Sequence, residues 1–202
     1  MQIQTTCKRI TTKSFITHNN IEYPINNGGG RKLGLYTEQL HKMINQFQVA
    51  YKKWGRTLMI RFDLHTEQAT PSNILMTSFR NKLEKKLKRR YPLDEIGYCW
   101  AREFHGDAKG EHFHWVLFLN GNVINYPAKI IPLIHSAWSH PAGGFTAHLE
   151  KQHYLFIDST NLVMEAVYWM SYLAKTQGKL YRSKQTKDYS TSRIKAPKTT
   201  ET

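Results

Sequence analysis

The chain has few cysteines, few acidic residues and no long apolar run, and each shortage excludes a class of protein. Its two cysteines, Cys7 and Cys99, form neither a CxxC motif nor a disulfide framework, so we expect a reducing compartment rather than a disulfide scaffold. No segment approaches the roughly 18 apolar residues that a membrane span requires, and the N-terminus lacks the apolar stretch of a secretory signal. The sequence therefore predicts a soluble, cytoplasmic protein without a membrane partner.

The shortage of acidic residues leaves the chain with a large positive charge. Lysine and arginine number 29 against 15 aspartates and glutamates, which gives a formal net charge of +14. Such a charge favours a polyanionic partner. The aromatic content of 12% suits nucleic acid in particular, because aromatic rings stack on unpaired bases.

The length of 202 residues is typical of one domain with a tail. The glycine run NNGGGRKLG has the residues of neither a P-loop nor a dinucleotide-binding fingerprint. We therefore interpret residues 1–34 as an N-terminal arm and linker, residues 35–180 as the domain with an N-terminal helix, and residues 181–202 as a basic tail.

Apolar periodicity predicts an α+β fold. Apolar residues recur at helical spacing in four segments, 35–55, 71–90, 126–138 and 162–175. Strands are expected at 56–65 and 145–150, and two further strands, EIGYCWAREFH and EHFHWVLFLNG, form a hairpin about the turn GDAKG. This order of elements favours a central antiparallel sheet with the helices packed mainly on one face.

A candidate metal site lies on this hairpin. His112 and His114 alternate with apolar residues along a strand, so both side chains point to the same face. Glu103 lies on the other arm, where a symmetric hairpin brings it close to one of these histidines. Two imidazoles and a carboxylate form an open site for a divalent cation. Glu111 and Asp107 compete with Glu103 for the role of the carboxylate ligand.

The helix near the C-terminus carries the second half of the candidate chemistry. Tyr168, Tyr172 and Lys175 occupy positions i, i+4 and i+7, which lie on one stripe of a helix. Two phenols and an ammonium on one helical stripe are unusual, and together with the histidine pair they favour a functional role for Tyr172 and Lys175. For Tyr168 we hold packing and function equal, because aromatic residues at helical spacing usually belong to a core. The group HLE at 148–150 is the nearest rival metal site, and Asp63 and His65 in RFDLH are interpreted either as part of the site floor or as polar residues at a strand end.

These motifs resemble those of a known enzyme family. The order of His-hydrophobic-His followed by YxxxYxxK resembles the HUH endonucleases, the nicking enzymes of rolling-circle replication. The segments RFDLH, GYCWARE, HFHWVLFLN, SYLAK and DYSTSR, in that order, are similar to the inovirus-type replication initiators of filamentous phages and enteric prophages. The resemblance covers residues 56–195, and it implies a Rep/relaxase-like palm fold whose central sheet carries the HUH motif.

The resemblance also implies a role for each site residue. It assigns the nucleophile to Tyr172, a second tyrosine to Tyr168 and a lysine partner to Lys175. Its metal ligands are His112, His114 and Glu103, which would bind Mg²⁺ or Mn²⁺ on the scissile phosphate. It implies single-strand nicking and joining through a 5′-phosphotyrosine, on single-stranded or cruciform origin DNA in a bacterial host. The chain has no Walker A motif and no room for a helicase domain, so unwinding would need a host helicase beside the polymerase.

Basic residues outside these motifs are candidate DNA contacts. They belong to the helix FRNKLEKKLKRR and to the start of the tail, and the set is Lys82, Lys85, Lys86, Lys88, Arg89, Arg90, Lys179 and Arg182. Charge runs of this kind also occur as solvated helix faces. Two alternatives to the nicking enzyme stay open, namely a catalytically silent DNA-binding relative that marks an origin or represses, and a relaxase or transposase of the same chemistry.

Overall fold

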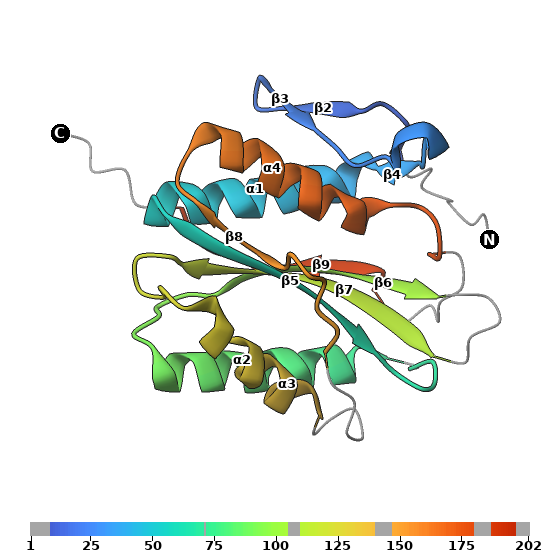
Figure 1. The fold of residues 1–202 in the computed structure, drawn as a ribbon. Coiled ribbons are helices and arrows are strands. Elements are labelled where there is room, and N and C mark those ends of the chain that lie inside the picture. Colours follow the sequence, from blue (N-terminus) through green and yellow to red (C-terminus); the bar gives the residue numbers. More distant parts are fainter. Residues whose placement is uncertain (1–8, 71, 105–109, 140–146, 180–186, 197–202) are drawn as a thin grey trace, which may run out of the picture.

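The computed structural model describes residues 9–70, 72–104, 110–139, 147–179 and 187–196. Its centre is a five-stranded antiparallel sheet with strand order β8-β5-β7-β6-β9 (Figure 1). The strands are β5 (Thr57–His65), β6 (Gly97–Phe104), β7 (Glu111–Asn120), β8 (Tyr154–Ile157) and β9 (Tyr189–Thr191). The expected α+β class with a central antiparallel sheet is therefore confirmed.

Helices cover both faces of this sheet, which corrects the expectation of helices mainly on one face. The helices α1 (Thr37–Trp54) and α4 (Thr160–Ser171) lie on one side, while α2 (Ile74–Arg90) and α3 (Ile131–Ser139) lie on the other (Figure 1). The physical reason is visible in the central strand β7, where Trp115 belongs to the core beneath α2 and α3 while Val116 and Phe118 belong to the core beneath α1 and α4. A strand that is apolar on both faces must be covered on both faces.

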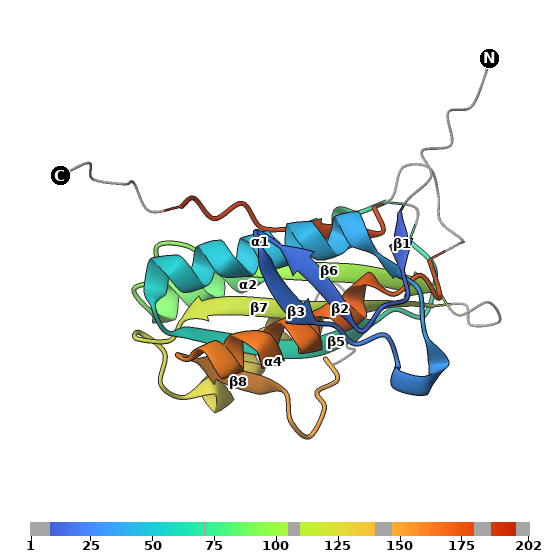
Figure 2. The ribbon, with the colours of Figure 1, turned by 90° about the horizontal axis from the view of Figure 1, so that it is seen from above.

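The N-terminal segment is part of the domain rather than an arm and linker. Strands β2 (Phe15–His18) and β3 (Ile21–Pro24) form a hairpin that lies over α4 (Figures 1 and 2). Its turn residues Asn19 and Asn20 both have positive φ, as the type I′ turn of a two-residue hairpin loop requires. The side chains of Ile16, Tyr23 and Ile25 are buried in the core shared with α1 and α4.

Two short strands and three 3-10 helices complete the fold. Strand β1 (Ile10–Thr11) pairs with β4 (Leu35–Tyr36), directly before α1. The 3-10 helices are η1 (Gly29–Arg31), η2 (Pro127–Lys129) and η3 (Tyr172–Ala174). Helix α1 ends at Gly55, whose φ of 70° suits a residue without a side chain.

The C-terminal half differs from expectation in three places. The expected helix 162–175 is divided into α4 and η3, so Tyr172 begins a tighter turn. Residues 145 and 146 of the expected strand lie outside the described residues, and the described part, 147–150, pairs with β5 through His148 and Asp63. Strand β8 lies in a stretch that the sequence pattern left unassigned. The expected basic tail contains β9, which pairs with β6. Two contacts hold this strand in place: the side chain of Ile194 is buried, and the backbone N–H of Tyr98 donates a hydrogen bond to the hydroxyl of Ser192. Within the described residues, no helix combines the length and the apolarity needed to cross a membrane.

Candidate functional site

The ends of three neighbouring strands bring polar side chains together on one face of the sheet. In the register of β5, β7 and β6, Asp63 lies opposite His114, and His112 lies between His65 and Glu103. Side chains alternate along each strand, so all five residues share the face covered by α1 and α4. The sequence-based expectation that Glu103 approaches the histidines therefore agrees with the geometry of the hairpin.

His114 is held between two carboxylates. Its Nδ1 lies 2.7 Å from Oδ1 of Asp63, and its Nε2 lies 3.0 Å from Oε2 of Glu103. Burial alone would lower the pKa of His114, but the hydrogen bond to Asp63 and the nearby Glu103 outweigh it, so that pKa is raised. Burial would raise the pKa of Glu103, yet His114 and Lys175 keep it below its usual value. Burial would likewise raise the pKa of Asp63, but the hydrogen bond to His114 outweighs it, so the pKa of Asp63 is lowered.

A chain of contacts joins this cluster to the tyrosine. Lys175 lies 2.9 Å from Oε2 of Glu103 and donates a hydrogen bond of 2.6 Å to the hydroxyl of Tyr172. The exposed fractions are 1% for Glu103, 7% for His114 and 6% for Lys175, whereas Tyr172 is only partly buried. A partly accessible phenol is thus supported from the protein side by a buried cation and its carboxylate.

The segment that presents Tyr172 is fixed by the residues that follow it. Lys179 donates hydrogen bonds to the carbonyl of Leu173 and, at 3.3 Å, to Gln39 on α1. Gly178 has a φ of 76° and passes Glu103 so closely that a Cβ there would lie 3.3 Å from the Cβ of Glu103. The expectation that Lys179 contacts DNA is therefore corrected, because its ammonium is buried and bound inside the protein.

The buried polar atoms provide a test of whether a cation fits this site. If Nδ1 of His114 donates to Asp63, its Nε2 presents a lone pair toward Glu103. This Nε2 and both carboxylate oxygens of Glu103 are buried, and none of them makes a hydrogen bond of acceptable geometry, although Oε2 also forms the ion pair with Lys175. Such facing acceptors suit a bound cation, so His114 and Glu103 fit two ligand positions.

The third ligand is not in place in this arrangement. Among the residues that the structure describes, no group of three histidines, cysteines, aspartates or glutamates is positioned to hold a metal ion. His112 packs its ring edge-to-face against His65, with ring centroids 4.1 Å apart, on the same face as His114. His112 would have to turn toward His114 to complete the expected set of ligands.

Arg61 is a site residue that the sequence analysis missed. Its guanidinium lies over the ring of Tyr172, with Cζ 5.2 Å from the ring centroid. Its Nε is buried without a hydrogen-bond partner, and no ion pair to its guanidinium occurs within the described ranges. The alternation of β5 carried the signal, because Arg61 lies two residues before Asp63 and must share its face. The ring of Tyr172 therefore contacts two cations, the guanidinium of Arg61 and the ammonium of Lys175, whose Nζ lies 4.0 Å from the ring centroid.

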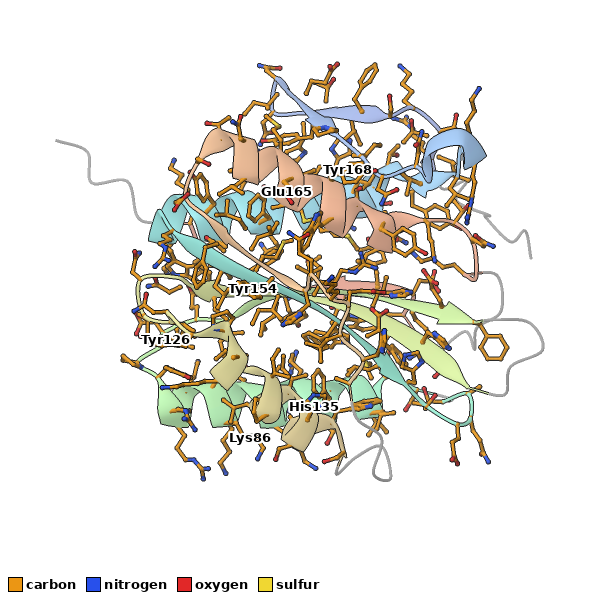
Figure 3. All side chains as sticks on the ribbon, in the orientation of Figure 1. Lys86, Tyr126, His135, Tyr154, Glu165 and Tyr168 are labelled. Atoms are coloured by element: carbon orange, nitrogen blue, oxygen red, sulfur yellow. The ribbon has the colours of Figure 1, made fainter. Side chains whose placement is uncertain are left out.

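Tyr168 and the expected DNA contacts on α2 lie apart from this cluster. The side chain of Tyr168 is 41% exposed on α4, whereas Lys86 lies on α2, on the other side of the sheet (Figure 3). Among the expected DNA contacts on α2, the exposed side chains are those of Lys85, Lys88, Arg89 and Arg90, and the half-buried ones are those of Lys82 and Lys86. Arg182 lies outside the described residues. A strand held at Tyr172 would reach α2 only by passing around an edge of the sheet.

The rival carboxylate Glu111 does not join the cluster. Glu111 points to the α2 side, where it pairs with Arg102 at 2.9 Å and accepts hydrogen bonds from Thr70. Asp107 lies outside the described residues. In the group HLE, His148 pairs through its backbone with Asp63.

Comparison with known proteins gives one match. No curated protein and no solved structure matches the chain significantly. A family model described as the YagK/YfjJ C-terminal domain, a family of enteric prophage proteins, matches residues 19–192. This match contains β5, β6, β7 and the segment of Tyr172 and Lys175, so it includes every residue of the contact chain. The chain belongs to the YagK/YfjJ C-terminal domain family of prophage proteins.

Proposed function

We propose that this protein is an HUH-type endonuclease that nicks and rejoins single-stranded DNA through Tyr172. The observation that supports the proposal best is the contact chain from Asp63 through His114, Glu103 and Lys175 to the hydroxyl of Tyr172. A nucleophile held by a buried cation, which is in turn held by a carboxylate, follows the general logic of an activated nucleophile.

The chain's own residues account for the properties that the reaction requires. The hydroxyl of Tyr172 attacks the phosphorus, the Tyr–O–P bond forms, and the bond from phosphorus to the 3′-oxygen breaks. The products are a 5′-phosphotyrosine and a 3′-hydroxyl, so the phenolic proton is balanced by the proton that the leaving oxygen gains. Lys175 stabilises the developing phenolate through its hydrogen bond, and Arg61 offers donors to a non-bridging phosphate oxygen beside the same ring.

A divalent cation, Mg²⁺ or Mn²⁺, is part of this proposal. Its ligands would be His114 and Glu103 with His112 as the third, and Asp63 would orient the imidazole of His114 as a carboxylate does behind many metal-bound histidines. When bound, the cation would polarise the scissile phosphate. The acceptor atoms of His114 and Glu103, which are buried without a hydrogen bond of acceptable geometry, support this assignment.

Initiation of rolling-circle replication of a prophage-like element is the biological setting that we propose. Membership of an enteric prophage family supports it, as does the net charge of +14, which suits origin DNA. The 3′-hydroxyl would prime a host polymerase, and a host helicase would unwind the origin in the bacterial cytoplasm. A relaxase or transposase would use the same chemistry on a different substrate.

Detection of a covalent adduct tests the chemistry. Purified protein is incubated with labelled single-stranded DNA of the element's origin region and Mn²⁺, and the products are separated under denaturing conditions. We expect a labelled protein band that requires the cation and maps to the peptide containing Tyr172. Specific binding of the same DNA without any adduct would instead support the catalytically silent binding module.

A further inference from the structure

A groove separate from the tyrosine site lies between α2 and the edge strand β9. It has a volume of about 520 Å³, and Tyr98 lines it. A smaller cavity of about 120 Å³ adjoins it and shares Arg80, Tyr98, Lys187 and Ser190 with it. Tyr98 belongs to the core on the α2 side of the sheet, so this groove opens on the face opposite to Tyr172.

Four cations line the groove, of which Lys88 pairs with Glu84 and the other three come from separate parts of the chain. Arg80 comes from α2, Lys187 precedes β9 and Arg193 follows it. In the described part of the chain none of the three forms an ion pair, and the guanidinium of Arg80 bonds only to Asn81 and to the hydroxyl of Tyr98. These cations therefore retain the capacity to bind an anion.

The carboxylates that line the same groove are largely neutralised by other residues. Glu84 pairs with Lys88 at 2.9 Å, and Glu95 pairs with Lys53 outside the groove, which keeps the pKa of Glu95 below its usual value. Among the described residues, Asp94 is the one carboxylate of the groove that forms no ion pair. The groove therefore carries a net positive charge.

We propose that this groove binds the phosphodiester backbone of a single DNA strand away from the nick, with a base stacked on Tyr98. The phosphate oxygens would contact Arg80, Lys187 and Arg193, and aromatic rings with adjacent arginine suit single strands of any sequence. An acidic peptide would use the cations but would leave the aromatic ring without a role. This inference rests on the proposed DNA substrate, and it adds a second holding point on the opposite face of the sheet.

Binding without cleavage isolates the groove from the chemistry. The affinity for labelled single-stranded oligothymidylates of increasing length is measured by fluorescence anisotropy in EDTA. The test variant combines Arg80→Gln, Lys187→Gln and Arg193→Gln. The control variant carries the same loss of charge at three exposed lysines outside the groove, namely Lys13→Gln, Lys52→Gln and Lys151→Gln.

We expect the groove variant to lose about tenfold in affinity at low salt and to reduce the salt slope by about 2, because each phosphate contact with a single strand contributes roughly 0.7. The control variant should lose much less. Lys187→Gln and Arg193→Gln are also measured singly. Both side chains are exposed, so these variants should fold normally even if Arg80→Gln disturbs the fold. A strand carrying 5-iododeoxyuridine should crosslink to the peptide containing Tyr98.

Equal affinities of the groove and control variants would overturn the proposal. Equally strong competition by thymidine monophosphate and by oligothymidylate would overturn the assignment to a strand in favour of a mononucleotide site. If the wild type forms the covalent adduct and the groove variant binds DNA with normal affinity, the role of the groove is refuted and the nicking activity is not. Groove-dependent binding without any adduct would support the groove and refute the proposed nicking activity.

Discussion

Lys175 donates a hydrogen bond of 2.6 Å to the hydroxyl of Tyr172, although the two residues are only three positions apart at the end of a helix. The contact is possible because α4 tightens into a 3-10 turn at Tyr172, and residues i and i+3 eclipse in such a turn. The same ammonium contacts Glu103 on the sheet. Tyr172 is thereby tied to the polar cluster, whereas Tyr168 is exposed one turn earlier.

This asymmetry predicts which tyrosine attacks first. We expect Tyr172→Phe to abolish first-strand cleavage and the covalent adduct, because it removes the attacking oxygen and keeps the ring. Tyr168→Phe should still nick and should be impaired chiefly in the later transfer that ends a round. Peptide mapping of the trapped adduct checks the assignment. An adduct on Tyr168 in the wild type, together with normal cutting by Tyr172→Phe, would reverse it.

Arg61 provides a second prediction, because its guanidinium lies on the ring of Tyr172 without an ion-pair partner in the described residues. Arg61→Gln should slow single-turnover cleavage by about 10²-fold, the typical loss for one donor to a developing charge. Arg61→Lys should retain part of the rate, since it keeps the charge but loses the planar fork of donors. The control is Arg31→Gln at an exposed arginine of η1. Wild-type cleavage rates in Arg61→Gln would exclude a role for Arg61 at the phosphate.

The metal ligands provide a third prediction. We expect Mn²⁺ to raise the melting temperature of the wild type, because a ligand that binds the native state stabilises it. His114→Gln should lose this shift and should lower cation-dependent cleavage by at least about 10²-fold. His112→Gln tests the third position, and His153→Gln serves as the control at a histidine that bonds to the carbonyl of Glu150. An unchanged shift in His114→Gln would remove this histidine from the metal site.

The sequence predicted best those features that depend on strict alternation. The hairpin of β6 and β7 follows from alternating apolar residues about a glycine-containing turn, so the approach of Glu103 to the histidines could be predicted. The spacing of three residues placed Tyr172 and Lys175 on one side of a helix, but the hydrogen bond between them depends on the 3-10 turn that the spacing did not predict. The assignment of metal ligands and nucleophile stays a prediction.

Other features could not be predicted because they depend on tertiary contacts. The burial of Lys179 results from a bond to the carbonyl of Leu173, and a lysine in a basic segment gives no sign of such a partner. The strands β8 and β9 have four and three residues, so their alternation is too short to stand out. The N-terminal hairpin was missed, and the one signal for it was the pair Asn19 and Asn20 between two short segments that contain apolar residues.

The N-terminal hairpin also gives a prediction about stability and pH. His18 on β2 faces His41 on α1, with 2.8 Å between their Nδ1 atoms and stacked rings. Burial, and then the charge of His41, lower the pKa of His18 in the folded protein. One imidazole of the pair must stay neutral to accept the hydrogen bond that joins the hairpin to the helix.

The sign of the effect follows from proton binding. As pH falls through about 6.5, the unfolded chain takes up a proton at this position while folded His18 resists it, so acidification favours unfolding. We expect His18 to contribute a fall in the free energy of unfolding, measured with urea, of at most about 1.4 kcal/mol per pH unit between pH 7.5 and pH 5.5, while His114, whose pKa is raised, contributes in the opposite direction. His18→Gln should reduce this dependence, whereas His153→Gln should leave it unchanged. A dependence of equal size in His18→Gln would show that other groups cause it, since burial also lowers the pKa of His65.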